Sequence, residues 1–143
     1  MPSLRPHRTH HWFWPAMLLM GSALAALAWV VLALATGRQA GWMAVVAALE
    51  VSWMLHLGTL RRGPLRLAVT LAGILAVTIA ANWGIVAGHI GAMMGLGLLD
   101  SAGRLGPHLA WTYARLLNST ADLAWLAAAL LLGSWLAMGK RRR

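Results

Sequence analysis

Cysteine is absent from this 143-residue chain, and charged residues are scarce. Without a thiol the protein has no disulfide exchange, no thiolate metal site and no covalent haem attachment. Charged side chains make up only 10% of the sequence, whereas a soluble domain usually carries about a quarter. With 60% hydrophobic residues, the chain has too little polar surface to face water on all sides. The composition therefore predicts an integral membrane protein whose main partner is the lipid bilayer.

The apolar residues gather into four segments whose interiors contain no Lys or Arg. A helix needs roughly 20 apolar residues to cross a hydrocarbon core of about 30 Å, so four crossings and their joints use nearly the whole chain. Helices are favoured because four spans with short loops cannot close a barrel, and an open sheet edge in lipid leaves backbone groups unpaired. We therefore predict an all-α fold, a single membrane domain over residues 1–143, built as a four-helix transmembrane bundle. The expected spans are about 16–35, 42–60, 65–88 and 120–138.

The first expected span also resembles a secretory signal, because Ala33-Leu34-Ala35 has the small residues of a cleavage site. Its apolar run is long for a signal, however. We therefore expect a permanent helix.

Basic residues fall mainly on one side of the expected bundle. They precede the first span, separate the second from the third, and close the chain, which predicts an inner-membrane protein with both termini in the cytoplasm. Such a face would also attract anionic lipid headgroups. Because the charge is scattered over short joints instead of forming one stripe, a nucleic-acid partner is not expected. The residues on this side are Arg5, Arg8, Arg61, Arg62, Arg66 and Lys140 to Arg143, against Arg38 and Arg104 on the other.

The third joint is the longest. Its glycine-rich part, residues 91–97, predicts a loose segment, whereas residues 107–117 have a polar and an apolar side and predict a short interfacial helix in this outer loop. A continuous helix over residues 107–138 is the alternative, but it would be about 48 Å long and would stand out of the bilayer. We favour a break at Ser119, because Ser119 followed by Asp122 has the spacing of a capping box.

Glu50 is the leading candidate for a functional residue. It lies near the middle of the second expected span, where an ionisable side chain costs about 3 kcal/mol and marks a functional site by default. Antiparallel pairing of the second and third spans places Thr78 within one helical turn of it. A protonated Glu50 bonded to Thr78 or to a backbone carbonyl would be structural, whereas a carboxylate facing a wet cavity would load and release protons or cations. Both interpretations are open.

Three further polar residues are expected inside the spans. His56 is level with Ser22 and Ser134, whose hydroxyls could satisfy its ring. Asp122 belongs to the first turn of the last span, where a carboxylate favours the positive end of the helix dipole. Asn82 lies at a comparable depth and could bond to Asp122.

His89, Met93 and Met94, with His108 across the third joint, form the only cluster with metal-ligand chemistry. Imidazoles and thioethers suit Cu(I), although methionine in such a segment usually serves packing, which is the interpretation we favour. A haem held by His56 and His89 is not expected, because the two lie roughly 20 Å apart along the bundle. A haem or pigment with one protein ligand is a further alternative.

Small residues recur every fourth position in the third span, ending in a GxxxG pattern. Such a stripe lets a second helix approach closely, whether from the same chain or from another. The stripe includes Ala76, Ala80, Gly84 and Gly88.

The chain has no nucleophile and base pairing and no phosphate loop, so an enzyme is not expected. We expect a non-catalytic accessory subunit or assembly factor that docks on a larger membrane complex through its helix faces. The alternatives are a homo-oligomeric, proton-coupled transporter using Glu50, and a copper-, haem- or pigment-binding membrane protein. In size and helix count the chain is similar to the small multidrug resistance transporters, but their essential glutamate is in the first helix, not the second. That resemblance is confined to architecture.

Overall fold

The computed structural model describes residues 13–139, and over that range all regular secondary structure is helical, with no strand. Three of the helices in this part are long and apolar enough to cross a membrane, namely α1, α3 and α6, while α2 is apolar but shorter. The all-α prediction is therefore confirmed. The helices are α1 (Phe13–Thr36), α2 (Met43–Leu57), α3 (Pro64–Met94), α4 (Leu98–Arg104), α5 (Pro107–Leu117) and α6 (Thr120–Met138).

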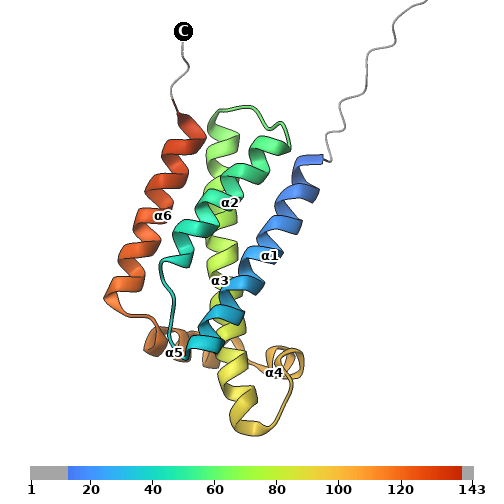
Figure 1. Cartoon of the computed structure of the whole chain (residues 1–143), viewed down its shortest axis with the longest axis vertical. Coiled ribbons are helices and arrows are strands. Elements are labelled where there is room, and N and C mark those ends of the chain that lie inside the picture. Colours follow the sequence, from blue (N-terminus) through green and yellow to red (C-terminus); the bar gives the residue numbers. More distant parts are fainter. Residues whose placement is uncertain (1–12, 140–143) are drawn as a thin grey trace, which may run out of the picture.

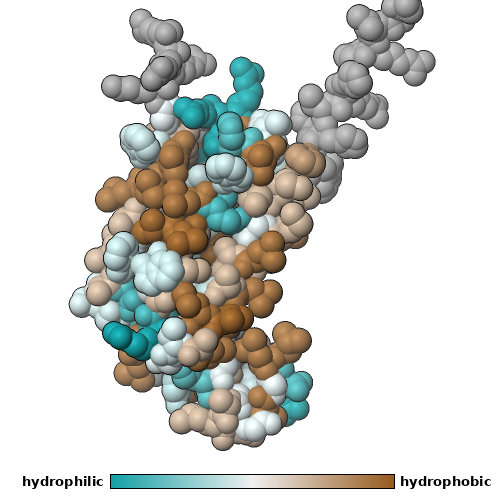
Figure 2. Space-filling view, in the orientation of Figure 1, coloured by the Kyte–Doolittle hydropathy of each residue, from teal (hydrophilic) through white to brown (hydrophobic). Residues whose placement is uncertain are grey.

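Helices α2 and α3 form the centre of the bundle. They contact each other, and each packs against both α1 and α6, whereas α1 and α6 do not touch within residues 13–139. In Figure 1 the start of α1, the α2–α3 joint and the end of α6 lie at the top, and α4 and α5 gather at the opposite end. We refer to these as the α2–α3 end and the α4–α5 end. Hydrophobic side chains cover much of the flank between them (Figure 2).

Helix α3 is longer than predicted. It has 31 residues, which is about 46 Å at 1.5 Å per residue, and it continues through Gly91 to Met94. The prediction of a loose segment there was wrong for residues 91–94. Gly91 is buried against α4, where a methyl group in its place would collide with Ser101, so packing outweighs the helix penalty of glycine. The helix ends at Gly95, whose φ of 68° is left-handed and suits a residue without a side chain.

Helix α2 is shorter than predicted, because it ends at Leu57 and not at residue 60. The amide of Thr59 donates to His56 O (3.1 Å), and the amide of Leu60 donates to Leu55 O (3.2 Å), which is the bonding pattern of a Schellman cap. Thr59 occupies the left-handed position of this cap with a φ of 60°. Glycine is the usual residue there, and nothing in the sequence around Thr59 signals such a turn.

The last two helices have the bounds that the sequence indicated. Helix α5 covers residues 107–117, and α6 begins after a break at Ser119, so a continuous helix over residues 107–138 is excluded. The capping box is formed: Asp122 N–H donates to Ser119 Oγ (3.3 Å), and Ser119 N–H donates to Asp122 Oδ2 (2.8 Å). Helix α4 was not predicted.

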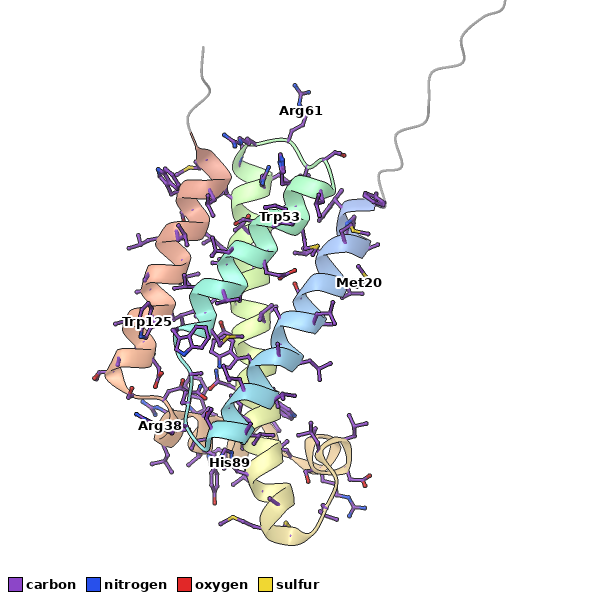
Figure 3. The ribbon with its side chains drawn as sticks, viewed as in Figure 1. Met20, Arg38, Trp53, Arg61, His89 and Trp125 are labelled. Carbon is purple, nitrogen blue, oxygen red and sulfur yellow. The ribbon has the colours of Figure 1, made fainter. Side chains whose placement is uncertain are left out.

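The core lies where α1, α2 and α3 meet, and Trp29 is its largest fully buried side chain. Val51 and Leu55 of α2 and Ile74 of α3 are buried beside it in the same cluster. Trp53 and Trp125, by contrast, are 65% and 46% exposed on the flank of the bundle (Figure 3). A wholly apolar helix does not reveal which of its sides faces outward.

Candidate functional site

Glu50 lies at the contact between α2 and α1. Both of its carboxyl oxygens are buried, and neither has a hydrogen-bond partner among the residues that the structure describes. The side chain occupies the space that Gly21 leaves open, because a methyl group at Gly21 would collide with Glu50 Oε1 and lie 2.6 Å from Met54 Cγ. Gly21 is therefore what allows this carboxyl group into the bundle.

The bond between Glu50 and Thr78, which one of the two interpretations proposed, is not formed. Thr78 Oγ1 donates to Ile74 O of its own helix at 2.8 Å. Helix α2 turns Val51 toward α3, where a methyl group at Gly73 would be 3.0 Å from Val51 Cγ1. Because successive helical residues are rotated by about 100°, Glu50 then faces a different neighbour, which is α1. Counting residues from the joint between two spans predicts which residues lie at the same depth in the membrane. It does not predict the direction in which each side chain points around its helix.

An isolated carboxylate is costly in a low-dielectric interior unless it is paired and hydrogen-bonded. The other acidic residues are remote from Glu50 along the fold: Asp100 is on α4, and Asp122 is in the first turn of α6. A carboxyl group in this setting is suited to two tasks. It can hold a proton as a neutral acid, or it can pair with a cation that enters between α1 and α2.

Arg66 is buried near the α2–α3 end, with only 5% of its surface exposed. Its Nη2–H donates to Ser52 O (3.1 Å) and its Nη1–H donates to Leu60 O (3.2 Å). The guanidinium therefore lies at the carboxyl end of α2, where the helix dipole favours a positive charge. From the sequence alone, Arg66 served only as a marker of orientation. Its position inside the first turn of an apolar helix was the available signal for burial.

Three side-chain amides form a cluster at the α4–α5 end. Gln39 Nε2–H donates to Asn82 Oδ1 (3.2 Å) and to Asn118 Oδ1 (3.0 Å), and Asn118 Nδ2–H donates to Asn82 Oδ1 (2.6 Å). The cluster joins the α1–α2 connection, α3 and the α5–α6 connection. Asn82 thus bonds to these amides and not to Asp122 as expected. Asp122 instead caps α6 and packs against Gly41, where a methyl group would lie 2.8 Å from Asp122 Cα.

His56 is exposed in the last turn of α2. The hydroxyls expected to satisfy it do not: Ser134 Oγ–H donates to Leu130 O at 2.7 Å, and Ser22 Oγ has no partner in the described part of the chain. The expectation failed because His56 faces away from the core.

The predicted metal ligands lie on the α4–α5 side of the bundle, where Figure 3 shows His89 far from Arg61. His89 Nδ1 lies 2.8 Å from Ile85 O, which leaves Nε2 as the free ring nitrogen. Met93 is 85% exposed, Met94 is also exposed, and His108 is exposed on α5. Within residues 13–139 no group of three or more His, Asp or Glu side chains is placed to hold a metal ion. A copper site that uses the two methionines stays an untested alternative to the packing role that the sequence favoured.

The small residues of the α3 stripe lie in two different environments. Gly84 and Gly88 receive α1, because methyl groups in their places would lie 2.6 Å from Val30 Cγ2 and from Leu34 Cδ1. Ala76 and Ala80 are exposed, and so are the neighbouring Leu75 and Ile79. The glycines therefore pack the chain against itself, while the alanines belong to a face of α3 that no other helix within residues 13–139 covers. We call Leu75, Ala76, Ile79 and Ala80 the open face of α3.

Comparison with protein-family models, with curated proteins and with solved structures gives no match to this chain.

Proposed function

We propose that the protein is a multi-pass protein of the inner membrane, in which α1, α2, α3 and α6 all cross and the α2–α3 end is cytoplasmic. Helix α2 has only 15 residues, about 22 Å, yet it is packed against all three of the longer apolar helices. A helix in that position shares their depth. The start of α1 and the end of α6 lie at the same end of the bundle, in keeping with an even number of crossings (Figure 1).

Within the membrane, we propose that the protein acts as a non-catalytic subunit or assembly factor and docks on another membrane protein. The observation that carries this proposal is the open face of α3. Small residues at Ala76 and Ala80 let a second backbone approach closely, and Ile79, which is 67% exposed, supplies apolar contact beside them. The same helix uses glycines one and two turns further along to receive α1, so close packing is the mode by which α3 binds helices.

Purification of the tagged full-length chain from its own membranes in mild detergent tests this proposal. The double variant Ala76→Leu/Ala80→Leu should lose a partner chain that the unaltered protein retains, because leucines keep the two backbones apart. The matched control is Ala124→Leu/Ala128→Leu, which makes the same change on exposed positions of α6 and should retain the partner. A chain that elutes alone and monodisperse, or a partner lost equally from both variants, would contradict the proposal.

A second candidate function is proton-coupled transport through Glu50. The two buried oxygens without partners favour it, since a group that must exchange a proton or a cation gains from having no fixed bond. In vesicles with an imposed pH gradient and ethidium as the probe cation, Glu50→Gln should abolish uptake, while Asp100→Asn, on the distant α4, should not. Uptake that survives unchanged in Glu50→Gln would eliminate this function.

A further inference from the structure

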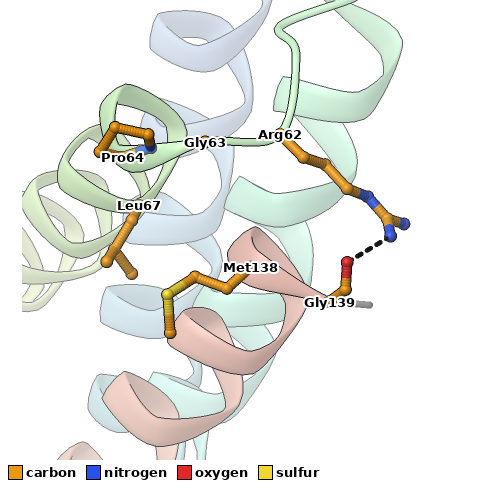
Figure 4. Close-up of a pocket in the computed structure, with 6 residues that line it drawn as sticks. All are labelled: Arg62, Gly63, Pro64, Leu67, Met138 and Gly139. Carbon is orange, nitrogen blue, oxygen red and sulfur yellow. Dashed lines mark hydrogen bonds between the residues drawn. The ribbon is translucent and has the colours of Figure 1, made fainter. Parts of the chain in front are cut away.

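The α2–α3 end contains an open hollow between the start of α3 and the end of α6. Figure 4 shows it between the two helices, with the α2–α3 joint along one side. The lining residues are Arg62, Gly63, Pro64, Leu67, Met138 and Gly139.

The polar side of the hollow is positively charged. Arg62 Nη1–H donates to Gly139 O (3.1 Å), which holds the guanidinium across the hollow and leaves most of its five N–H donors available. Helix α3 begins here at Pro64, and its N-cap residue Gly63 provides no side-chain cap, so the first-turn amides face the same region. The positive end of this long helix dipole adds to the charge of Arg62.

No acidic side chain balances that charge. The chain has only three acidic residues, of which Asp100 and Asp122 lie at the α4–α5 end and Glu50 faces α1. Arg61 is exposed next to Arg62, and four further basic residues follow Gly139 directly in the sequence. The anion that this end attracts must therefore come from outside the chain.

The other side of the hollow is apolar. Leu67 is half-buried on α3, and Met138 is exposed on α6, so the two side chains line a groove that leads from the charged rim onto the apolar flank. A free inorganic anion has no hydrocarbon to pack against this apolar side. A ligand with a phosphate at one end and a hydrocarbon chain at the other fits both sides.

We propose that this hollow binds an anionic phospholipid of the cytoplasmic leaflet, with its phosphate accepting hydrogen bonds from Arg62 and an acyl chain lying along Leu67 and Met138. The inference requires the membrane placement proposed above, but it depends on neither of the two proposed functions.

Native mass spectrometry of the full-length chain released from nanodiscs of equal phosphatidylglycerol and phosphatidylcholine tests the site. The unaltered protein should retain phosphatidylglycerol preferentially, and Arg62→Gln should lower that preference by about tenfold or more, because it removes charge-assisted hydrogen bonds to the phosphate as well as a charge. Arg61→Gln removes the same charge from the neighbouring position, which does not line the hollow, and should lower the preference by no more than about fivefold, the diffuse effect of one basic residue at a membrane surface.

A steric variant separates the hollow from charge and from folding. Gly63 is extended, and a side chain added there meets open space, so Gly63→Phe fills the hollow without changing the charge or displacing the backbone. It should lose the retained lipid as Arg62→Gln does. Equal losses in Arg61→Gln and Arg62→Gln, or lipid retention that survives Gly63→Phe, would overturn the proposal and indicate diffuse attraction. Displacement of the lipid by inorganic phosphate alone would also overturn it, because the ligand would then be the free anion.

Discussion

The centre and the α4–α5 end of the bundle both contain partly buried polar side chains, but within residues 13–139 only three amide side chains at the α4–α5 end hydrogen-bond to one another. Three hydrogen bonds join Gln39, Asn82 and Asn118, although Gln39 Oε1 has no partner, whereas neither carboxyl oxygen of Glu50 has a partner in the described structure. An unsatisfied buried group normally costs about 1–3 kcal/mol. The hydrogen bonds of the amide cluster give it a structural role. Glu50 makes no such bond, and an ionisable side chain without a partner inside an apolar helix is the stronger functional candidate.

Gly21→Leu gives the largest effect, because the new side chain must enter the space that holds Glu50 and Met54. We expect a loss of about 3 kcal/mol in the free energy of unfolding. The measurement is equilibrium unfolding in mixtures of dodecylmaltoside and dodecyl sulfate. The control is Ala28→Leu, which also introduces a leucine into α1, adding one carbon fewer at an exposed position, and should change stability by less than about 0.5 kcal/mol.

A second substitution shows whether that loss arises at Glu50. Glu50→Ala removes the side chain from the contact, so the double variant Gly21→Leu/Glu50→Ala should recover about 1–2 kcal/mol relative to the sum of the two single changes. Simple additivity would show that Glu50 and Gly21 do not share this space.

Asn82→Leu should destabilise the protein by about 1.5 kcal/mol, near the upper limit for hydrogen bonds between helices in membranes. It leaves amide groups of Gln39 and Asn118 without their shared acceptor. The control is Thr112→Val, since the hydroxyl of Thr112 bonds only to His108 O of its own helix. Unfolding in the same detergent mixtures provides the comparison. If the two variants lost equal stability, the cluster would not hold the three connections together.

Thr59→Gly should stabilise the protein by about 1 kcal/mol, because glycine adopts a φ of 60° without the steric cost of a β-branched residue. Thr36→Gly, in the last turn of α1, relieves no such steric cost, because Thr36 is helical, and it should therefore destabilise the protein. The shift in unfolding midpoint distinguishes them. A loss of stability in Thr59→Gly would mean that the threonine side chain makes a contribution larger than the strain.

Local signals in the sequence were sufficient to predict the bounds of the two C-terminal helices, α5 and α6. Pro107 marks the start of α5, and the pair Ser119 and Asp122 marks the start of α6, because each acts through bonds or sterics within one turn. The continuation of α3 through Gly91 and the presence of α4 could not be predicted in this way, although Gly95 is a local signal for the end of α3. They depend on a tertiary contact between Gly91 and Ser101, which no pattern within either segment reveals.

The candidate site was predicted in composition but not in orientation. Glu50 stood out because it is an acid in an apolar segment, yet its neighbour is Gly21 of α1 and not Thr78 of α3. Helix α2 is apolar on all sides, so its sequence contains no periodic signal for the direction in which residue 50 points. Arg66 was missed as a buried group for the same reason, since its acceptors are backbone carbonyls of α2, which every sequence offers.

The unfolding free energy of Glu50→Gln tests the central comparison most directly. Glutamine keeps the shape of the side chain and removes only its ability to ionise. If Glu50 has no structural partner, the substitution leaves stability within about 0.5 kcal/mol of the unaltered protein, while any proton-dependent activity is lost. A loss of about 2 kcal/mol or more would show that the carboxyl group makes a specific bond in the folded protein and would contradict the account.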